Sequence, residues 1–334
     1  MTESTSTTRP AGPVFVAGLE RTGTSLMYAL LSSHPEIAMT RRTNLWRYFY
    51  RRYGDLSHDR NLDRCLDVMS RYKRLVKLNI DWDRLRRDFR SGPSSYPRLF
   101  ELLERQFADR VGKPRWGDKS LMTERHAQQI LAAYPGARII HMIRDPRDRY
   151  ASVQKRWERR RGGAGVGVAQ WRFSVRRAEK NTVRWPDSYL LVRYEDLVSD
   201  PEGHLKTVCG FIGVDYTAEM LSMQGADDFD ETGNSSYGRR RAGAITTDSI
   251  GRFRDVLSEG QVRYIERAVS GPMQRLGYEP DRPSQNRLAG LWFTMVVVPL
   301  EGARMYLWEV RDRVLDRVGR RIPSHRFVRS ETGT

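Results

Sequence analysis

The 334-residue sequence has only two cysteines, Cys65 and Cys209. They are too few for a zinc cluster or a disulfide framework, so we expect two buried thiols and a cytoplasmic, reducing compartment. His, Cys and Asp residues nowhere show the spacing of metal ligands, and no metal is expected. Residues 1–12 are polar and threonine-rich and lack the apolar core of a signal peptide, so they predict a disordered tail.

Negative charge is also scarce. Lys and Arg number 58 against 41 Asp and Glu, a formal net charge of +17. This excess suggests an anionic ligand or surface, which could be a nucleotide, a nucleic acid or an acidic lipid. The arginines are scattered among acidic residues and no nucleic-acid-binding motif is present, so a nucleic-acid partner is not expected. The length fits one elaborated α/β domain or two smaller ones.

Long hydrophobic runs are missing as well. The apolar stretch at residues 288–300 is too short to span a bilayer and contains Pro299, so it could form a core helix or an interfacial one. Residues 301–321 mix apolar side chains with many arginines, which is typical of a basic amphipathic helix. That helix could give peripheral membrane contact, or it could pack on the domain or on a partner. The sequence leaves the oligomeric state open.

The most specific pattern lies at residues 14–26. An apolar run breaks into a turn with Gly18 and Gly23 and resumes as a helical pattern, which predicts a strand, a loop and a helix. Free N–H groups at the helix start, with hydroxyls from Thr22, Thr24 and Ser25, would form an anion site. The spacing matches a P-loop, but Thr24 replaces its lysine, which argues against ATP or GTP hydrolysis. The nearby cation is Arg21; an ordinary strand-to-helix turn is the alternative.

Further along the chain, short apolar runs alternate with helical patterns. Residues 138–143 and 188–192 predict buried strands, and the rhythm indicates a parallel sheet with crossover helices. Residues 45–112 predict a helical insertion, and the glycine-rich run at 159–167 a loop. After residue 143, a charged turn with Arg144 leads into a helix that carries Ser152. Loops at the carboxyl ends of parallel strands open on the same side, so both turns could bind one ligand with two phosphates; a simple Asp-capped helix start is the alternative.

These motifs resemble those of the PAPS-dependent sulfotransferases, with distant similarity to tyrosyl-protein and carbohydrate sulfotransferases. The stretches Gly18–Leu26, Trp116–Ser120, Tyr194–Leu197 and Gly251–Arg254 follow the family's order. The resemblance implies a P-loop-like three-layer α/β fold over residues 13–282, a C-terminal helical extension at 283–334, and 3'-phosphoadenosine 5'-phosphosulfate (PAPS) as donor without a metal. It implies donor contacts from Gly18, Arg21, Thr22, Gly23, Thr24, Ser25, Leu26, Arg144, Ser152, Tyr194, Gly251 and Arg252.

The resemblance also suggests catalytic residues. Arg21 matches the family's catalytic cation, and Lys119 is a second candidate for stabilising charge on the leaving oxygens. Tyrosyl-protein sulfotransferases carry a glutamate base where this chain has Arg42, so we expect Asp118 to act as the base and doubt a peptide-tyrosine acceptor. His34 and His141 are expected to be structural.

The acceptor is expected to be a hydroxyl of a carbohydrate, glycolipid or small molecule. Residues 43–53 could border its cleft or form a packed amphipathic helix. A P-loop nucleotide or small-molecule kinase and a non-catalytic basic binding module remain alternative functions.

Overall fold

The computed structural model describes residues 12–156, 163–226, 245–281, 293–319 and 321–328. The expected tail at residues 1–12 therefore lies outside the described residues except for Gly12. Cys65 and Cys209 are buried and free, as the sequence predicts.

A five-stranded parallel sheet forms the centre of the molecule, in the order β2-β3-β1-β4-β5. Its strands are β1 (Val14–Gly18), β2 (Ile37–Arg41), β3 (Arg115–Lys119), β4 (Arg138–Ile143) and β5 (Tyr189–Arg193). Because β1 is central and all its residues are buried, the loop that follows it opens at the middle of the sheet's carboxyl edge. The α/β fold predicted from the sequence is confirmed.

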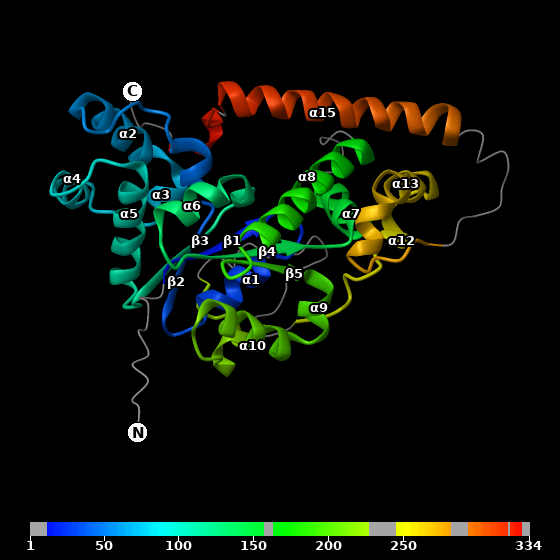
Figure 1. Cartoon of the computed structure of the whole chain (residues 1–334), viewed down its shortest axis with the longest axis horizontal. Helices are drawn as coiled ribbons and strands as arrows, with labels where there is room; N and C mark the ends of the chain where they lie inside the picture. The colour runs from blue at the N-terminus through cyan, green and yellow to red at the C-terminus, as the bar shows by residue number, and fades with distance from the viewer. Residues whose placement is uncertain (1–11, 157–162, 227–244, 282–292, 320, 329–334) are drawn as a thin grey trace, which may run out of the picture.

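Helices cover both faces of the sheet (Figure 1). Val14 and Val16 point into a core with α1 (Thr24–Ser32), α9 (Tyr194–Ser199) and α10 (Pro201–Ile212). Phe15 and Ala17 point the other way, into a core with α5 (Tyr96–Arg110) and α6 (Ala127–Ala133). This division follows from the two-residue alternation of side chains along a strand.

The remaining helical elements extend these layers. They are α2 (Asp59–Arg71), α3 (Lys73–Val76), α4 (Trp82–Arg90), α7 (Pro146–Arg156), α8 (Gly163–Arg184), α12 (Phe253–Val256), α13 (Glu259–Arg275) and α15 (Val298–Val318), with π-helical turns at Leu45–Phe49 and Phe293–Val297 and 3-10 turns at Thr123–His126, Ala218–Ser222 and Ser324–Arg326. Residues 45–112 are largely helical, as predicted. Among the described helices, none is both long and apolar enough to cross a membrane.

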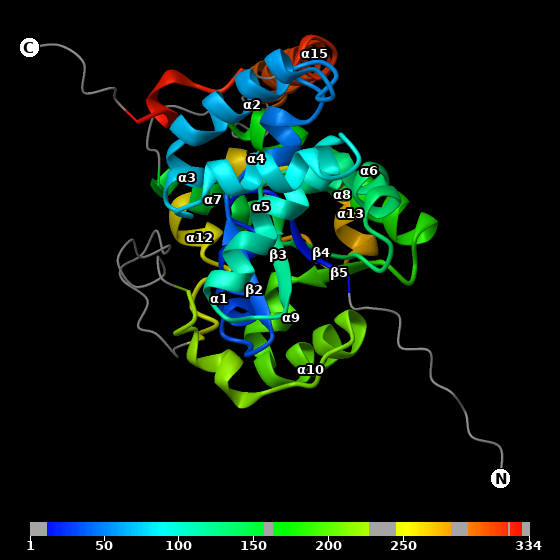
Figure 2. The ribbon, with the colours of Figure 1, turned by 90° about the vertical axis from the view of Figure 1, so that its left-hand side faces the viewer.

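A loop was predicted for the glycine-rich run at residues 159–167, of which residues 159–162 lie outside the described residues. From Gly163 onward the prediction is wrong, because α8 already begins there. A Cβ on Gly165 would lie 1.9 Å from the Glu301 carbonyl oxygen, so glycine permits the close approach of α15. Figures 1 and 2 show α15 on the outer side of α8, at the same end of the molecule as α2.

Candidate functional site

The loop between β1 and α1 is a tight turn that requires glycine at both ends. Gly18 and Gly23 have φ angles of 124° and 90°, in a region that side chains disfavour. A Cβ on Gly18 would lie 2.5 Å from the Met142 carbonyl oxygen, and one on Gly23 would lie 2.5 Å from the Tyr194 ring. Inside the loop, the Thr22 hydroxyl donates a 2.8 Å hydrogen bond to the Leu19 carbonyl. The shape of the loop thus depends on its own glycines and Thr22 and on the neighbouring Met142 and Tyr194.

Helix α1 starts directly at this loop. Its N-cap is Gly23, no side chain caps its first turn, and that turn contains no acidic residue. The first backbone N–H groups and the positive end of the helix dipole therefore face the loop, and the first turn supplies no carboxylate to balance them, which favours a bound anion. Thr24 and Ser25 bring hydroxyl groups to the same turn. Leu26 instead packs in the core, so its side chain stabilises the helix and does not line the site.

A second turn, after β4, meets the first. The Arg21 Nε donates to the Ser152 hydroxyl of α7 at 2.8 Å, and an Arg144 Nη1 lies 3.4 Å from the Arg21 carbonyl oxygen. Strands β1 and β4 are parallel neighbours in the sheet, so the turns that follow them lie side by side at its carboxyl edge. The sequence-based expectation that the two turns address one site agrees with this geometry.

Arg144 is built into this junction. Its guanidinium lies over the Tyr194 ring at 4.5 Å, and one Nη donates to the Ser249 carbonyl at 2.5 Å. Tyr194 and Ser249 share a further hydrogen bond of 2.6 Å through their hydroxyls. The Arg144 Nε is buried and has no hydrogen-bond partner among the described residues. A buried cationic donor without a partner is costly, and an anionic group bound beside it would remove that cost.

Gly251 and Arg252 reach the site through Asp148, a residue that the sequence reasoning missed. The Asp148 carboxylate accepts hydrogen bonds from the backbone N–H groups of Gly251 and Phe253, at 2.7 and 2.9 Å. Asp148 lies in the first turn of α7, four residues after Arg144. Only the folded structure shows that this acid anchors a segment one hundred residues away.

Lys119 enters the site from β3. Its ammonium group is buried and donates to the Ser25 hydroxyl at 3.3 Å. Burial is the main reason that the pKa of Lys119 lies well below its usual value, and the charges of Arg42 and Arg41 lower it further, whereas Asp118 opposes the shift. An anion in the loop would therefore compensate a crowded group of cations.

Asp118 lies on the other face of the sheet. It is adjacent to Lys119 in the same strand and pairs in register with Phe15, so its side chain points away from α1. Its carboxylate accepts hydrogen bonds from Thr40 and Thr43, at 3.1 and 2.9 Å. Burial raises the pKa of Asp118. The structure therefore does not bring Asp118 together with Arg21 and Lys119, and the candidate base faces a core.

Glu104 of α5 joins Asp118 in that core. Burial, and then the neighbouring Asp118, hold the pKa of Glu104 well above its usual value. The Thr40 hydroxyl oxygen lies 3.1 Å from a carboxyl oxygen of Glu104 and 3.1 Å from one of Asp118, but it carries a single hydrogen to donate. A protonated Glu104 can donate to the Thr40 oxygen, which leaves the Thr40 hydrogen for Asp118. The other carboxyl oxygen of Glu104, Oε2, is buried and has no hydrogen-bond partner among the described residues, which further disfavours the ionised form.

A buried polar chain supports the loop from below. Glu124 accepts a 3.3 Å hydrogen bond from the Gly18 N–H and a 3.0 Å bond from the Ser174 hydroxyl. Ser174 in turn contacts His141 at 2.9 Å, and the other His141 nitrogen contacts Tyr189 at 2.5 Å. His141 is thus a core residue, as expected. No sequence signal marks Glu124, because it lies in a polar stretch that reads as a surface turn.

The segment expected at the acceptor side begins beside Lys119. The Arg42 N–H donates to the Lys119 carbonyl at 2.8 Å. Trp46, Tyr48 and Phe49 are buried in the core, which supports the packed interpretation of these aromatic residues. His34 is structural, since its ring contacts the Asp215 carbonyl at 2.9 Å and accepts from the Glu36 N–H.

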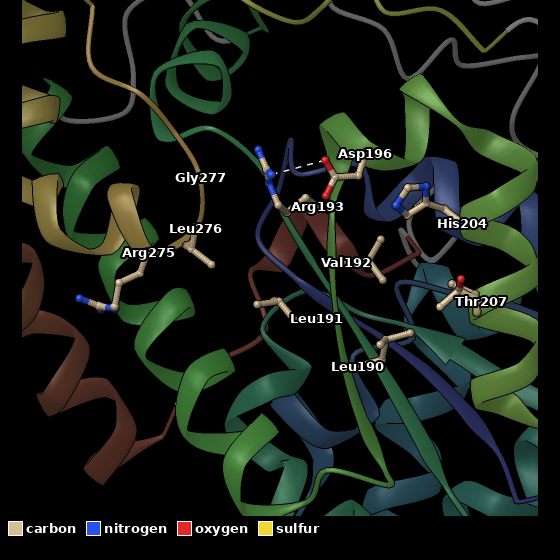
Figure 3. Close-up of a pocket in the computed structure, with 11 residues that line it drawn as sticks. Leu190, Leu191, Val192, Arg193, Asp196, His204, Thr207, Arg275, Leu276 and Gly277 are labelled. Carbon is tan, nitrogen blue, oxygen red and sulfur yellow. Dashed lines mark ion pairs between the residues drawn. The ribbon is translucent and has the colours of Figure 1, made fainter.

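A cavity of about 440 Å³ lies elsewhere, beside the edge strand β5 (Figure 3). Leu190, Leu191 and Val192 form its floor, and Arg193 pairs with Asp196 at 3.5 Å on its rim. No residue of the loop at 18–25 lines it, so it is separate from the anion site. The described residues contain no group of three or more His, Cys, Asp or Glu side chains that could hold a metal.

Comparison with known proteins adds independent information. Residues 13–218 match the profile of the sulfotransferase family. The chain is 23% identical over 296 residues to protein-tyrosine sulfotransferase A of Caenorhabditis elegans, covering 82% of this chain and 69% of the relative. It is 35% identical over 95 residues to carbohydrate sulfotransferase 2 of Mus musculus, which covers 27% of this chain and 17% of that protein.

Solved structures agree at the level of the fold. The sulfotransferase domain of the Synechococcus PCC 7002 olefin synthase superposes with a TM-score of 0.56 at 20% identity, covering 80% of this chain and 94% of that domain. The sulfotransferase domain from the curacin biosynthetic pathway gives 0.51 at 17% identity, covering 82% of this chain and 100% of that domain.

Proposed function

The chain belongs to the sulfotransferase family, and from that premise we propose that it transfers the sulfuryl group of PAPS to an acceptor hydroxyl and releases adenosine 3',5'-bisphosphate (PAP). One observation carries the proposal. Two anion-binding turns, the uncapped start of α1 and the buried Arg144, meet through the Arg21 to Ser152 contact. A ligand with phosphate groups at two separate places suits this arrangement.

The donor's two ends differ in what would hold them. The loop N–H groups, that of Thr22 included, and the hydroxyls of Thr24 and Ser25 suit the 5'-phosphosulfate, whereas the Thr22 hydroxyl is donated to the Leu19 carbonyl. Arg144 and Ser152 suit the 3'-phosphate, and the unpartnered Arg144 Nε supports this assignment. Tyr194 would lie near the adenine. Gly251 and Arg252, held by Asp148, would cover the donor.

The reaction is an in-line displacement at sulfur. The acceptor oxygen forms a bond to sulfur while the bond from sulfur to the 5'-phosphate oxygen breaks, and the electron pair stays on the leaving phosphate. Charge therefore builds on the bridging and leaving oxygens, where fixed cations lower the barrier. We assign this role to Arg21, whose guanidinium never loses its charge, and to Lys119, whose charged form an adjacent anionic donor would favour.

We propose a positioning role for Asp118 in place of the base role expected from the sequence. Its carboxylate holds the Thr40 and Thr43 hydroxyls beneath the turn at Arg42, which contacts Lys119 through the backbone. It acts through these neighbours and faces away from the donor loop. The acceptor's proton would then leave to another group or to solvent.

We propose a carbohydrate, glycolipid or small-molecule hydroxyl as the acceptor. The basic residues where tyrosyl-protein sulfotransferases carry a glutamate support this choice. The proposed division into a transferase domain at 13–282 and an extension at 283–334 is compatible with α15, which packs on α8 as a separate outer helix.

Calorimetric titration tests the donor. We expect PAP to bind without Mg²⁺, and ATP to bind far more weakly with or without Mg²⁺. ATP binding that requires Mg²⁺ would contradict the proposal and favour a kinase, and absence of binding by either nucleotide would favour a non-catalytic basic module. Incubation with sulfur-labelled PAPS and candidate hydroxyl compounds, followed by mass spectrometry, then identifies the acceptor.

A further inference from the structure

The outer face of α15 is apolar. Six of its exposed side chains form what we call the outer stripe: Leu300, Tyr306, Leu307, Val310, Val314 and Val318. Leu307 is 66% exposed and Val318 is 70% exposed. Positions 300, 307, 314 and 318 recur at intervals of seven and four, so they lie along one side of the helix. A continuous exposed row of this kind marks an interaction surface in a folded protein.

The opposite face of the same helix carries buried polar side chains. Asp312 is 6% exposed and forms a 2.6 Å ion pair with Arg125. Glu301 is similarly buried and accepts a 2.6 Å hydrogen bond from the Gly165 N–H of α8. An ordinary amphipathic helix buries its apolar side against the domain. Helix α15 departs from this rule, because its inner face combines the apolar Met305 and Trp308 with buried acids while the apolar outer stripe stays exposed.

Buried ion pairs fix this orientation. Arg125 contacts both Asp312 and Asp316 and lies over the Phe173 ring at 4.0 Å. Arg172 of α8 pairs with Glu309. Turning α15 to bury the outer stripe would separate these charges from their partners, which is strongly destabilising for buried groups. The exposure of the stripe is therefore specified by the structure.

Charge beside the stripe indicates its partner. Arg304 and Arg311 lie along one margin and Arg313 along the other. Arg304 pairs with the buried Glu301 and Arg313 with Glu309, and the inward-facing Glu309 and Asp312 also pair with Arg172 and Arg125 of the domain. A second copy docked on this face would bring two chains that each carry a net charge of +17 together, with Arg311 of each copy beside the contact. An anionic lipid surface would satisfy both the apolar stripe and its basic margins.

We propose that the outer stripe of α15 binds the surface of an anionic lipid membrane, with the helix lying in the plane of the interface. This inference does not depend on the sulfotransferase activity. Docking in this way has a consequence for the site: the Arg52 guanidinium, in the segment expected at the acceptor side, reaches the Val318 carbonyl at 3.5 Å. Membrane binding would therefore bring that segment close to the lipid headgroups.

Sedimentation with vesicles tests the proposal on the full chain. Wild type is expected to sediment with phosphatidylcholine vesicles that contain phosphatidylglycerol and to stay in solution with phosphatidylcholine alone. The double variant Leu307→Gln/Val314→Gln should lose at least tenfold in partitioning, because each apolar side chain loses its transfer into the interface. Arg311→Gln/Arg313→Gln should lose about fivefold per arginine.

A matched control is Val183→Gln, at an apolar side chain of α8 that is 84% exposed but outside the stripe. It should partition as wild type does. Melting curves verify that every variant is folded. Equal binding of wild type and the double variant would overturn the proposal, as would wild type that ignores anionic vesicles. If the wild type does not bind vesicles but self-associates, and the double variant abolishes that self-association, the outer stripe binds a second copy of the chain.

Discussion

Replacing Arg144 with alanine should selectively remove recognition of the donor's 3'-phosphate. The guanidinium is buried, its Nε has no partner among the described residues, and one Nη is already committed to the Ser249 carbonyl. A hydrogen bond to a charged group contributes about 1.5–3 kcal/mol. The stacking of Arg144 on Tyr194 is present without the donor, so its loss affects stability and not the affinity for PAP. The expected loss is therefore about 1.5–3 kcal/mol, or roughly 10-fold to 150-fold in the dissociation constant of PAP.

The informative measurement is a ratio. Calorimetry gives the affinities of wild type and variant for PAP and for 5'-AMP, which lacks the 3'-phosphate. Wild type should prefer PAP strongly. Arg144→Ala should reduce that preference roughly 10-fold to 150-fold and leave the affinity for 5'-AMP nearly unchanged, with Ser152 as the remaining contact to the 3'-phosphate. Arg144→Lys keeps the charge without the planar fork and should fall between them.

The matched control is Arg138→Ala, at the opposite end of β4. Arg138 donates to the Phe211 carbonyl at 3.1 Å and lies over the Phe211 ring, so its removal has a similar local cost far from the donor. Its ratio of PAP to 5'-AMP affinity should equal that of wild type. If Arg144→Ala lowers the affinities for PAP and 5'-AMP by the same factor, so that their ratio stays at the wild-type value, the assignment of Arg144 to the 3'-phosphate is refuted.

Four further predictions concern the reaction and the buried acids. Arg21→Ala should reduce the turnover rate at least a hundredfold while PAP still binds, because the 3'-phosphate contacts remain; unchanged turnover in a single-turnover assay would remove its catalytic role. Lys119 must be charged to act, and its pKa is lowered, so turnover should fall as pH rises through that pKa; Lys119→Arg should abolish this alkaline fall, and persistence of the fall in a pH-rate profile would contradict the assignment. Asp118→Asn should raise KM more than it lowers kcat if the carboxylate only positions its neighbours, whereas a fall of a thousandfold in kcat with unchanged KM would restore the base role. The pKa of Glu104 is raised in the fold, so the folded state binds more protons at this group than the unfolded state does. Its contribution to stability is therefore fully present at low pH and is lost as pH rises from about 4.5 toward the raised pKa. Glu104→Gln should flatten this decline and raise the melting temperature at pH 8, and melting curves with the wild-type dependence on pH would contradict the raised pKa.

Two of the five strands, β2 and β3, were not predicted from the sequence. β4 and β5 contain apolar runs that predict buried strands, whereas β3 reads Arg-Trp-Gly-Asp-Lys and yet all five of its residues are buried. Its charged side chains are satisfied by residues distant in sequence, such as Thr40 for Asp118 and Ser25 for Lys119. Local patterns cannot reveal partners that only the folded chain supplies.

The same distinction explains Asp118. The motif places it beside Lys119, and adjacency suggested a shared site. Adjacent residues of a strand point to opposite faces of a sheet, so the assignment of residues 115–119 to a strand separates the two side chains. Glu124 and Asp148 were missed for a related reason: each holds a backbone N–H that lies 103 or more residues away.

The sequence by itself determined the chemistry of the donor site, because a strand, a glycine turn, a hydroxyl-rich helix start and the turn at Arg144 are local features whose geometry follows from nearby residues. It also predicted an amphipathic helix over residues 301–321, where the structure has a helix at Val298–Val318. Only the tertiary structure decided which face of that helix packs inward, since the choice depends on Arg125 and Arg172 of other elements. Local chain geometry is encoded by neighbours in sequence, whereas burial and charge pairing depend on neighbours in space.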